Sequence, residues 1–369
     1  MGILDRSIVK YKDKEITSLI KENQSISDLG KNNKIYNFVN VIKFDDLTLP
    51  YLTFVGNDAS FEITPIHINS GVLEYSTDTI NWTQIPSRST TSTGSVSTIY
   101  MRGKMNTNRL YLYYSYDPWK LLNVTEVRIY GNINVLLDYE NPPTTVLDSC
   151  YFSMFQECTN LIKAPALPAT GLGVSCYEST FSGCTSLKEP PVLPATTLTE
   201  GCYRSMFSGC TSLKEPPVLP ATTLAEGCYT SMFNNCTSLK EPPVLSATTL
   251  AEGCYRSMFN NCRNLKEVPI LPAIILAEEC YAFMFQGCYG LKEPSSLAIT
   301  TLAIGSCTFM FRYCINIKLY ETSTSEHNRP WRLPLTGIIN NIPTDAILGM
   351  FTNTGGEVTN INLHTTYYY

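Results

Sequence analysis

The stretch that decides the fold runs from Thr197 to Pro220 and reads TLTEGCYRSMFSGCTSLKEPPVLP. Its two cysteines belong to two columns that recur every 26 residues, with one step of 27. The first column is Cys150, Cys176, Cys202, Cys228, Cys254, Cys280 and Cys307, and the second is Cys158, Cys184, Cys210, Cys236, Cys262, Cys288 and Cys314. Phenylalanine keeps the same spacing from Phe155 to Phe311. Seven copies at a short fixed period predict a solenoid, whose repeats bury their apolar faces against one another.

The first half of the repeat has the pattern of an amphipathic helix. Apolar side chains recur every four residues at Leu198, Cys202, Met206 and Cys210, and polar residues occupy the other side. Thr197 and Glu200 match a capping box at its start. In the five central repeats the residue before the second cysteine is glycine or asparagine, both of which tolerate the left-handed conformation that ends a helix. These residues are Gly183, Gly209, Asn235, Asn261 and Gly287. We therefore expect a helix of about three turns in each repeat.

The second half of the repeat, residues 213–220, predicts an extended segment. Its leucines can stack on those of neighbouring coils in a parallel ladder. Each proline removes a backbone donor, so we expect strands of only about two to four residues, with part of the segment in a polyproline-like path.

The pattern Met-Phe-x-x-Cys-Thr-x-Leu, followed by Leu-Pro-Ala-Thr, resembles the BspA-like leucine-rich repeats of gut and oral anaerobes and of the phages that infect them. The resemblance covers residues 144 to about 320, and a weaker one links residues 72–139 to the β-domain that often precedes such repeats. It implies an α/β leucine-rich-repeat solenoid of about seven coils. It also implies surface display and attachment to proteins or glycans, with no catalytic residues to carry over.

The rest of the chain divides around the repeats. Residues 1–48 form an N-terminal attachment segment, partly helical, or alternatively a loosely ordered leader. Residues 49–142 predict a β-sandwich-like domain, because apolar and polar residues alternate at Phe61/Ile63, Leu73/Tyr75, Ile80/Trp82 and Val127/Ile129. Residues 143–320 form the solenoid. Residues 321–369 form a C-terminal cap and tail, in which Met350 and Phe351 mark a degenerate repeat over the open end.

Aromatic residues of the β-domain have two interpretations. They supply a sugar-stacking surface, or they pack in the core and across strands. The residues concerned are Trp82, Tyr111, Tyr113, Tyr114, Tyr116 and Trp119.

Composition excludes several classes of protein. The chain has 369 residues, a net charge of -5 and three histidines. The charge argues against nucleic acid as a partner, and the scarcity of histidine argues against an enzyme, a metal site or a cofactor. No apolar run approaches 18 residues, so we expect no membrane insertion. The first 20 residues are too charged for a secretory signal.

The cysteines are poorly spaced for zinc or for disulfides within a coil. Zinc sites favour cysteines about two to four residues apart, whereas these are eight apart in six repeats and seven apart in the last. Eight helical residues span about 12 Å, beyond the roughly 7 Å limit between the α-carbons of a disulfide. We expect 14 buried thiols that fill space as small apolar groups, with disulfides between coils as the alternative.

The exposed feature of most interest is a ladder of paired charges, one lysine and one glutamate in each of five coils. It comprises Lys188, Glu189, Lys214, Glu215, Lys240, Glu241, Lys266, Glu267, Lys292 and Glu293. Stacked coils place like charges about 5 Å apart along a column, with the opposite charge in the adjacent column. The ladder is either a solvated, mutually compensating face or a regular surface that docks a partner.

These features predict a non-enzymatic structural and binding protein. The first hypothesis is a phage virion component, such as a head fibre, decoration or tail fibre, which needs no secretion signal because it leaves by lysis. Residues 1–48 would then contact other virion proteins, the solenoid would contact a host surface protein or glycan, and we expect a homo-oligomer. The alternative is a BspA-type bacterial surface adhesin. A glycan-active enzyme is disfavoured, because the sequence offers few candidate acids for a defined cleft.

Overall fold

The computed structural model describes residues 10–11, 14–15, 46–56, 60–63, 71–87, 91–106, 121–122, 125–294, 297, 299–317, 343 and 345–354. The chain divides into two compact units, residues 1–48 and 49–369, each described here by itself. In the first unit, β1 (Lys10–Tyr11) and β2 (Lys14–Glu15) form an antiparallel pair. This pair lies within the segment that was expected to be partly helical. The rest of the proposed attachment segment up to residue 45 lies outside the described residues.

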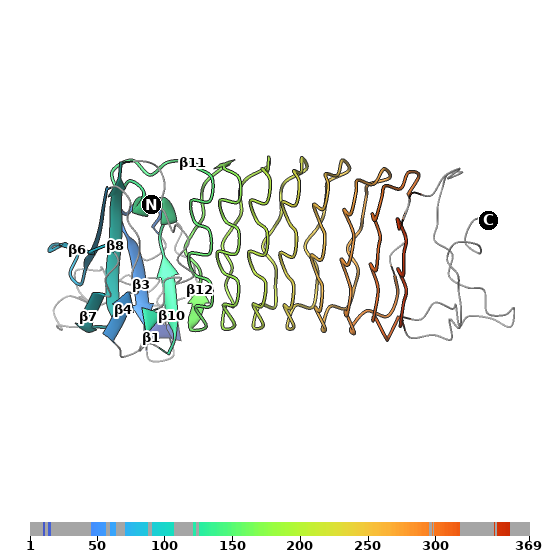
Figure 1. The fold of residues 1–369 in the computed structure, drawn as a ribbon. Helices are drawn as coiled ribbons and strands as arrows, with labels where there is room; N and C mark the ends of the chain where they lie inside the picture. The colour runs from blue at the N-terminus through green and yellow to red at the C-terminus, as the bar shows by residue number, and fades with distance from the viewer. Residues whose placement is uncertain are drawn as a thin grey trace, which may run out of the picture. The chain divides into compact units, whose positions relative to one another are not determined.

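The second unit begins with a six-stranded mixed sheet. Its order is β12 (Leu161–Lys163), β10 (Val127–Tyr130), β3 (Leu52–Gly56), β8 (Thr98–Met105), β5 (Gly71–Ser76) and β6 (Thr83–Gln84). Burial alternates along β8, because successive side chains point to opposite faces of a sheet. A three-stranded sheet has the order β7 (Thr91–Ser95), β4 (Ser60–Ile63) and β9 (Leu121–Leu122). Figure 1 shows these strands together at one end of this unit.

The predicted alternation is confirmed at four of its eight positions. Phe61, Leu73, Val127 and Ile129 are fully buried and lie on strands. The prediction is wrong at Ile80, which lies in the loop between β5 and β6 and is 80% exposed.

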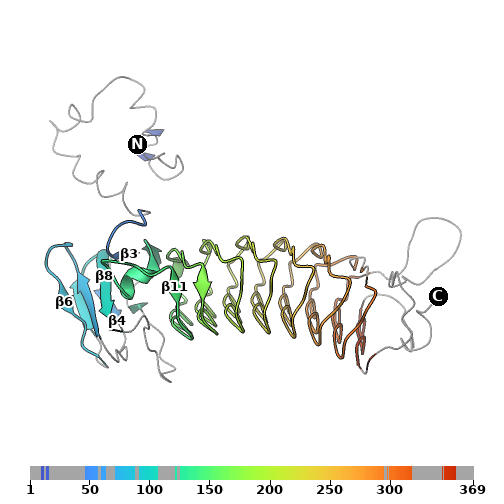
Figure 2. The same cartoon turned by 90° about the horizontal axis from the view of Figure 1, so that it is seen from above.

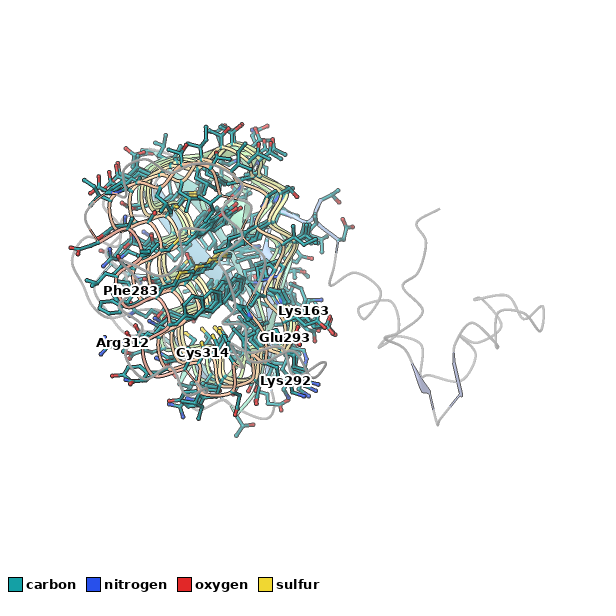
Figure 3. All side chains as sticks on the ribbon, turned by 90° about the vertical axis from the view of Figure 1, so that its right-hand side faces the viewer. Lys163, Phe283, Lys292, Glu293, Arg312 and Cys314 are labelled. Atoms are coloured by element: carbon teal, nitrogen blue, oxygen red, sulfur yellow. The ribbon has the colours of Figure 1, made fainter. Side chains whose placement is uncertain are left out.

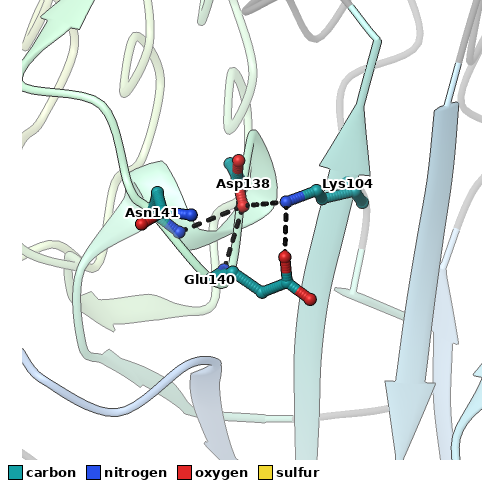
Figure 4. A network of polar contacts seen from close by, with 4 residues as sticks. All are labelled: Lys104, Asp138, Glu140 and Asn141. Atoms are coloured by element: carbon teal, nitrogen blue, oxygen red, sulfur yellow. Dashed lines mark hydrogen bonds and ion pairs between the residues drawn. The ribbon is translucent and has the colours of Figure 1, made fainter.

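A polar network ties β8 to the segment after the 3-10 helix η2 (Ile133–Leu136), as Figure 4 shows. The Lys104 ammonium donates to Asp138 and Glu140, each at 2.8 Å, and these hydrogen bonds raise its pKa to about 12. Desolvation raises the pKa of Asp138, but hydrogen bonds from Lys104 and from the backbone N–H groups of Asn141 and Glu140 outweigh it. The pKa of Asp138 therefore lies below its ordinary value.

The repeats continue directly from the sheet. Strand β12 of the first repeat pairs in parallel with β10, and Val127 lies opposite Leu161. A single cluster of buried apolar residues runs from Leu52 in β3 to Phe351 near the end of the repeats. Successive coils then stack on one another, as Figure 2 shows. Regular spacing, mixed strand pairing and this stacking are compatible with a repeat solenoid.

The predicted helix in each repeat is wrong, and no α-helix occurs among the described residues. The segment is instead a chain of tight turns with a positive φ at every fourth residue. In the third repeat these residues are Gly201 (φ 57°), Ser205 (φ 53°) and Gly209 (φ 74°). The left-handed conformation expected at Gly183, Gly209, Asn235, Asn261 and Gly287 is confirmed, with two further left-handed residues in each repeat.

The turn chain divides its backbone donors between two kinds of partner. The N–H groups of Tyr203, Ser205 and Phe207 donate to carbonyls of the next coil at 2.8 to 3.0 Å. The intervening N–H groups of Arg204 and Met206 donate to the carbonyl three residues earlier. In an α-helix these N–H groups would donate to carbonyls of the same helix, and almost none would be left to bond to the neighbouring coil. The turn chain thus closes each coil and joins it to the next.

Two ladders of stacked rings run through the core. Phenylalanines from Phe155 to Phe311 stack in register, and Phe351 continues the series, with centroid distances of 5.4 to 5.8 Å. Tyrosines from Tyr151 to Tyr281 stack at 5.5 to 6.1 Å. The backbone of residues 346–352 also accepts hydrogen bonds from the seventh repeat. The segment around Met350 and Phe351 therefore adds an eighth turn chain to the stack.

Strands in the repeats are short and few. Strands β11 (Thr145–Val146) and β13 (Gly171–Leu172) pair in parallel, and β12 has three residues. Beyond them, the described repeats show isolated parallel bridges such as Thr197–Thr223. The proline-containing segments bury their leucines, Leu213 among them, without forming a continuous sheet.

Candidate functional site

The charge ladder lies on the outside of the coil stack, and all ten of its side chains are exposed. The lysines are Lys188, Lys214, Lys240, Lys266 and Lys292, and the glutamates are Glu189, Glu215, Glu241, Glu267 and Glu293. Seen along the stack in Figure 3, Lys163, Lys292 and Glu293 lie on one side. The structure thus exposes all ten charges of the ladder on the outside of the coil stack.

Among the described residues, no two members of the ladder form an ion pair with each other. Glu189 pairs with Lys163, 3.8 Å away and outside the ladder. The glutamates of the next three coils, Glu215, Glu241 and Glu267, make no ion pair or side-chain hydrogen bond within the described residues. Their side chains stay in water, because an exposed pair gains too little Coulomb energy to hold two long side chains together. The structure therefore gathers these three glutamates without building a site around them.

An apolar stripe accompanies the ladder. One β-branched residue in each of four successive coils is exposed, with exposed fractions of 75% for Val192, 76% for Val218, 78% for Val244 and 84% for Ile270. Each follows the glutamate of its coil by three residues. The sequence analysis missed this stripe, because an apolar residue in an extended segment is ordinarily expected to lie in the core. The signal available was its 26-residue recurrence beside inward-facing leucines.

The cysteines have a structural role beyond filling space. All 14 lie among the described residues, where they are buried and none forms a disulfide. In the second column, each thiol from Cys184 to Cys314 donates to a phenylalanine carbonyl of the preceding coil, at sulfur–oxygen distances of 2.9 to 3.1 Å. Burial raises the pKa of Cys202 to about 11 and that of Cys262 to about 12. The thiols therefore remain protonated and unreactive at neutral pH.

We expect none of the 14 thiols to react with a thiol reagent in the folded protein at mildly alkaline pH, because burial removes both access and the thiolate. All 14 are expected to react after denaturation without a reducing agent. A count of released chromophore in both states checks this. Fewer than half the thiols reacting after denaturation would contradict free thiols and indicate disulfides.

The sugar-stacking interpretation of the β-domain is testable here only at Trp82, because the other five aromatic residues lie outside the described residues. The guanidinium of Arg102 lies 3.9 Å from the centre of the Trp82 ring, and Glu74 holds Arg102 at 2.8 Å. The Tyr51 ring lies 6.0 Å away, and the Trp82 indole N–H donates to the Thr79 carbonyl. Trp82 thus packs against its own domain.

The described residues contain no group of three or more His, Cys, Asp or Glu side chains placed to hold a metal ion. In the same part of the chain, no helix is long and apolar enough to cross a bilayer. Comparisons of the chain with family models, with curated proteins and with solved structures give no match.

Proposed function

We propose that this protein is a non-enzymatic structural and binding component of a phage virion, such as a head fibre, a decoration protein or a tail fibre. The observation that carries the proposal is the uninterrupted stack of coils built on the β-domain. Its backbone bonds run from coil to coil through eight turn chains. Such a stack holds its outer side chains in fixed columns, which suits a projecting attachment arm.

The finer assignment of fold belongs to the same proposal. We propose that the repeats are BspA-like leucine-rich repeats in which a turn chain takes the place of the helix, and that the two sheets preceding them form a β-sandwich-like domain. The buried Leu187 and Leu213 positions, one per coil, support the leucine-rich assignment.

The proposed partners follow from this arrangement. Residues 1–48 contact other virion proteins, and the coil stack contacts a host surface protein or glycan, with the protein assembled as a homo-oligomer. Peptide mass spectrometry of purified phage particles and of washed cell envelopes tests the proposal. Stoichiometric recovery in particles is the expected result. Recovery only in envelopes would overturn it in favour of a bacterial surface adhesin.

The charge ladder yields a separate prediction. We expect the double variant Lys214→Glu/Lys240→Glu to change the free energy of unfolding by less than about 1 kcal/mol, because both side chains are exposed and unpaired among the described residues. Chemical denaturation checks the stability. If the ladder docks a partner, the same variant reduces attachment to host cells. Undiminished attachment would leave the ladder as a solvated face.

A further inference from the structure

The last two cysteine-bearing coils differ from the others at the left-handed positions of the turn chain. One such position holds serine in five successive repeats, at Ser153, Ser179, Ser205, Ser231 and Ser257. The next two repeats place Phe283 (φ 58°) and Phe309 (φ 53°) there. The neighbouring left-handed positions carry Glu279 (φ 49°) and Tyr313 (φ 61°). Bulky residues rarely adopt this conformation, and such strain concentrates at functional sites.

These residues form one connected row. Arg256 makes an ion pair with Glu279, and its guanidinium lies 5.1 Å from the centre of the Phe283 ring. The Phe283 and Phe309 rings are 5.4 Å apart. Arg312 lies over Phe309 at 4.8 Å and over Tyr313 at 4.7 Å. We call this set the distal row: Arg256, Glu279, Phe283, Phe309, Arg312 and Tyr313.

The distal row is fitted to the coil that follows it. Gly349 occupies the same left-handed position in the eighth turn chain, with φ 56°. A Cβ atom at Gly349 would clash with the Phe309 ring, so any larger residue there would require the ring to move. In Figure 3, Phe283 and Arg312 lie on the side of the stack away from Lys292 and Glu293. The distal row and the charge ladder are therefore separate surfaces.

The charge of the distal row favours an anionic ligand. Glu279 compensates Arg256, whereas Arg312 has no carboxylate partner among the described residues. Arg312 donates to the Tyr313 hydroxyl at 2.9 Å, and its Nε is buried without a hydrogen-bond partner. The hydrogen bond to Tyr313 comes from Nη2, so Nη1 is the exchangeable donor that is left for a carboxylate.

We propose that the distal row binds a linear glycan that carries carboxylate groups. The sugar units pack along the half-buried Phe283 and Phe309 side chains and the exposed Tyr313 side chain, and a uronic or similar acid accepts a hydrogen bond from Arg312. A specific protein interface needs about 20 to 30 residues on each side, whereas this row is six residues long and follows the stack. Its ring-to-ring distance of 5.4 Å is comparable to the length of one sugar unit. This inference rests on the proposed attachment function and names its ligand class.

The test measures binding of the full-length protein to polygalacturonate, alginate and polysialic acid by calorimetry. Methyl-esterified polygalacturonate is the uncharged control for the ligand. We expect binding to at least one acidic glycan and at least about tenfold weaker binding when its carboxylates are esterified. No binding to any of the three acidic glycans would overturn the proposal, as would equal binding to the esterified polymer.

Variants locate the site. Phe283→Ser/Phe309→Ser gives both coils the residue that five other repeats carry, so we expect a Tm within about 5 °C of the native value and at least about tenfold weaker binding. Arg312→Lys keeps the charge but loses the planar contact, and is expected to weaken binding similarly. If the serine variant fails to fold, Arg312→Lys still tests whether the distal row binds the glycan. Unchanged affinity in Arg312→Lys would overturn the proposal.

The matched control is Lys214→Glu/Lys240→Glu, on the other side of the stack. We expect this variant to keep near-native affinity for the glycan. A loss equal to that of the distal-row variants would overturn the proposal, because binding would then depend on the overall charge of the protein. Failure of glycan binding leaves recovery in virions unaffected, so this inference and the proposed function fail separately.

Discussion

Replacing Phe207 with alanine is expected to lower the free energy of unfolding by about 3 to 5 kcal/mol. The Phe207 side chain is fully buried, and its ring stacks between those of Phe181 and Phe233 at 5.8 Å on each side. Alanine removes the ring from the middle of the ladder. Neighbouring rings cannot close the gap, because the backbone bonds between coils fix their spacing.

The loss of Phe207 is also expected to divide the unfolding transition. In a stack of repeats each coil is stabilised by its neighbours alone, so a weakened coil separates the segments on either side. Urea denaturation followed by circular dichroism measures the change, and limited proteolysis locates it. The matched control is Val218→Ala in the same repeat, which is 76% exposed and is expected to cost less than about 0.5 kcal/mol. Equal effects of the two variants would contradict the inward and outward assignment of this repeat.

Much of this core was predictable from the sequence. The recurrence of Cys202, Met206, Phe207 and Leu213 identifies the inward-facing residues, and each of them is fully buried. Burial follows from spacing alone, because any closed coil must turn the same residues inward in every copy. The turn chain was not predictable in this way. Apolar residues four apart satisfy both a helix with 3.6 residues per turn and a chain of turns with a period of four.

The candidate surfaces were predictable only in part. The exposed charge ladder follows from the charges themselves, since ionised side chains are rarely buried without partners. The distal row depends on contacts between repeats, such as Arg256 with Phe283 and Phe309 with Gly349, which the sequence places 27 and 40 residues apart. Its sequence signal was the change from serine to phenylalanine at one repeat position. That signal has meaning only once the position is known to be left-handed.

The turn chain itself is tested by substitutions at Gly209. Its φ is 74°, and a Cβ atom there would lie 3.5 Å from the backbone of Gly183, which is an ordinary contact. A Cβ atom thus has room, so the left-handed conformation is the main cost of a substitution. We expect Gly209→Val to lower the free energy of unfolding by about 2 to 3 kcal/mol, because a β-branched residue is strongly disfavoured there.

Two further substitutions at Gly209 distinguish the turn chain from a helix. Gly209→Asn is expected to cost less than about 1 kcal/mol, because Asn235 and Asn261 occupy the same position with φ of 58° and 60°. Gly209→Ala separates the two local structures. Alanine would stabilise a helix by about 1 kcal/mol relative to glycine, whereas a positive φ makes the same change destabilising. Urea denaturation of the three variants measures the differences. Stabilisation by alanine would contradict the turn chain and restore the helix, whereas the order Asn, Ala, Val of increasing loss follows from the left-handed backbone.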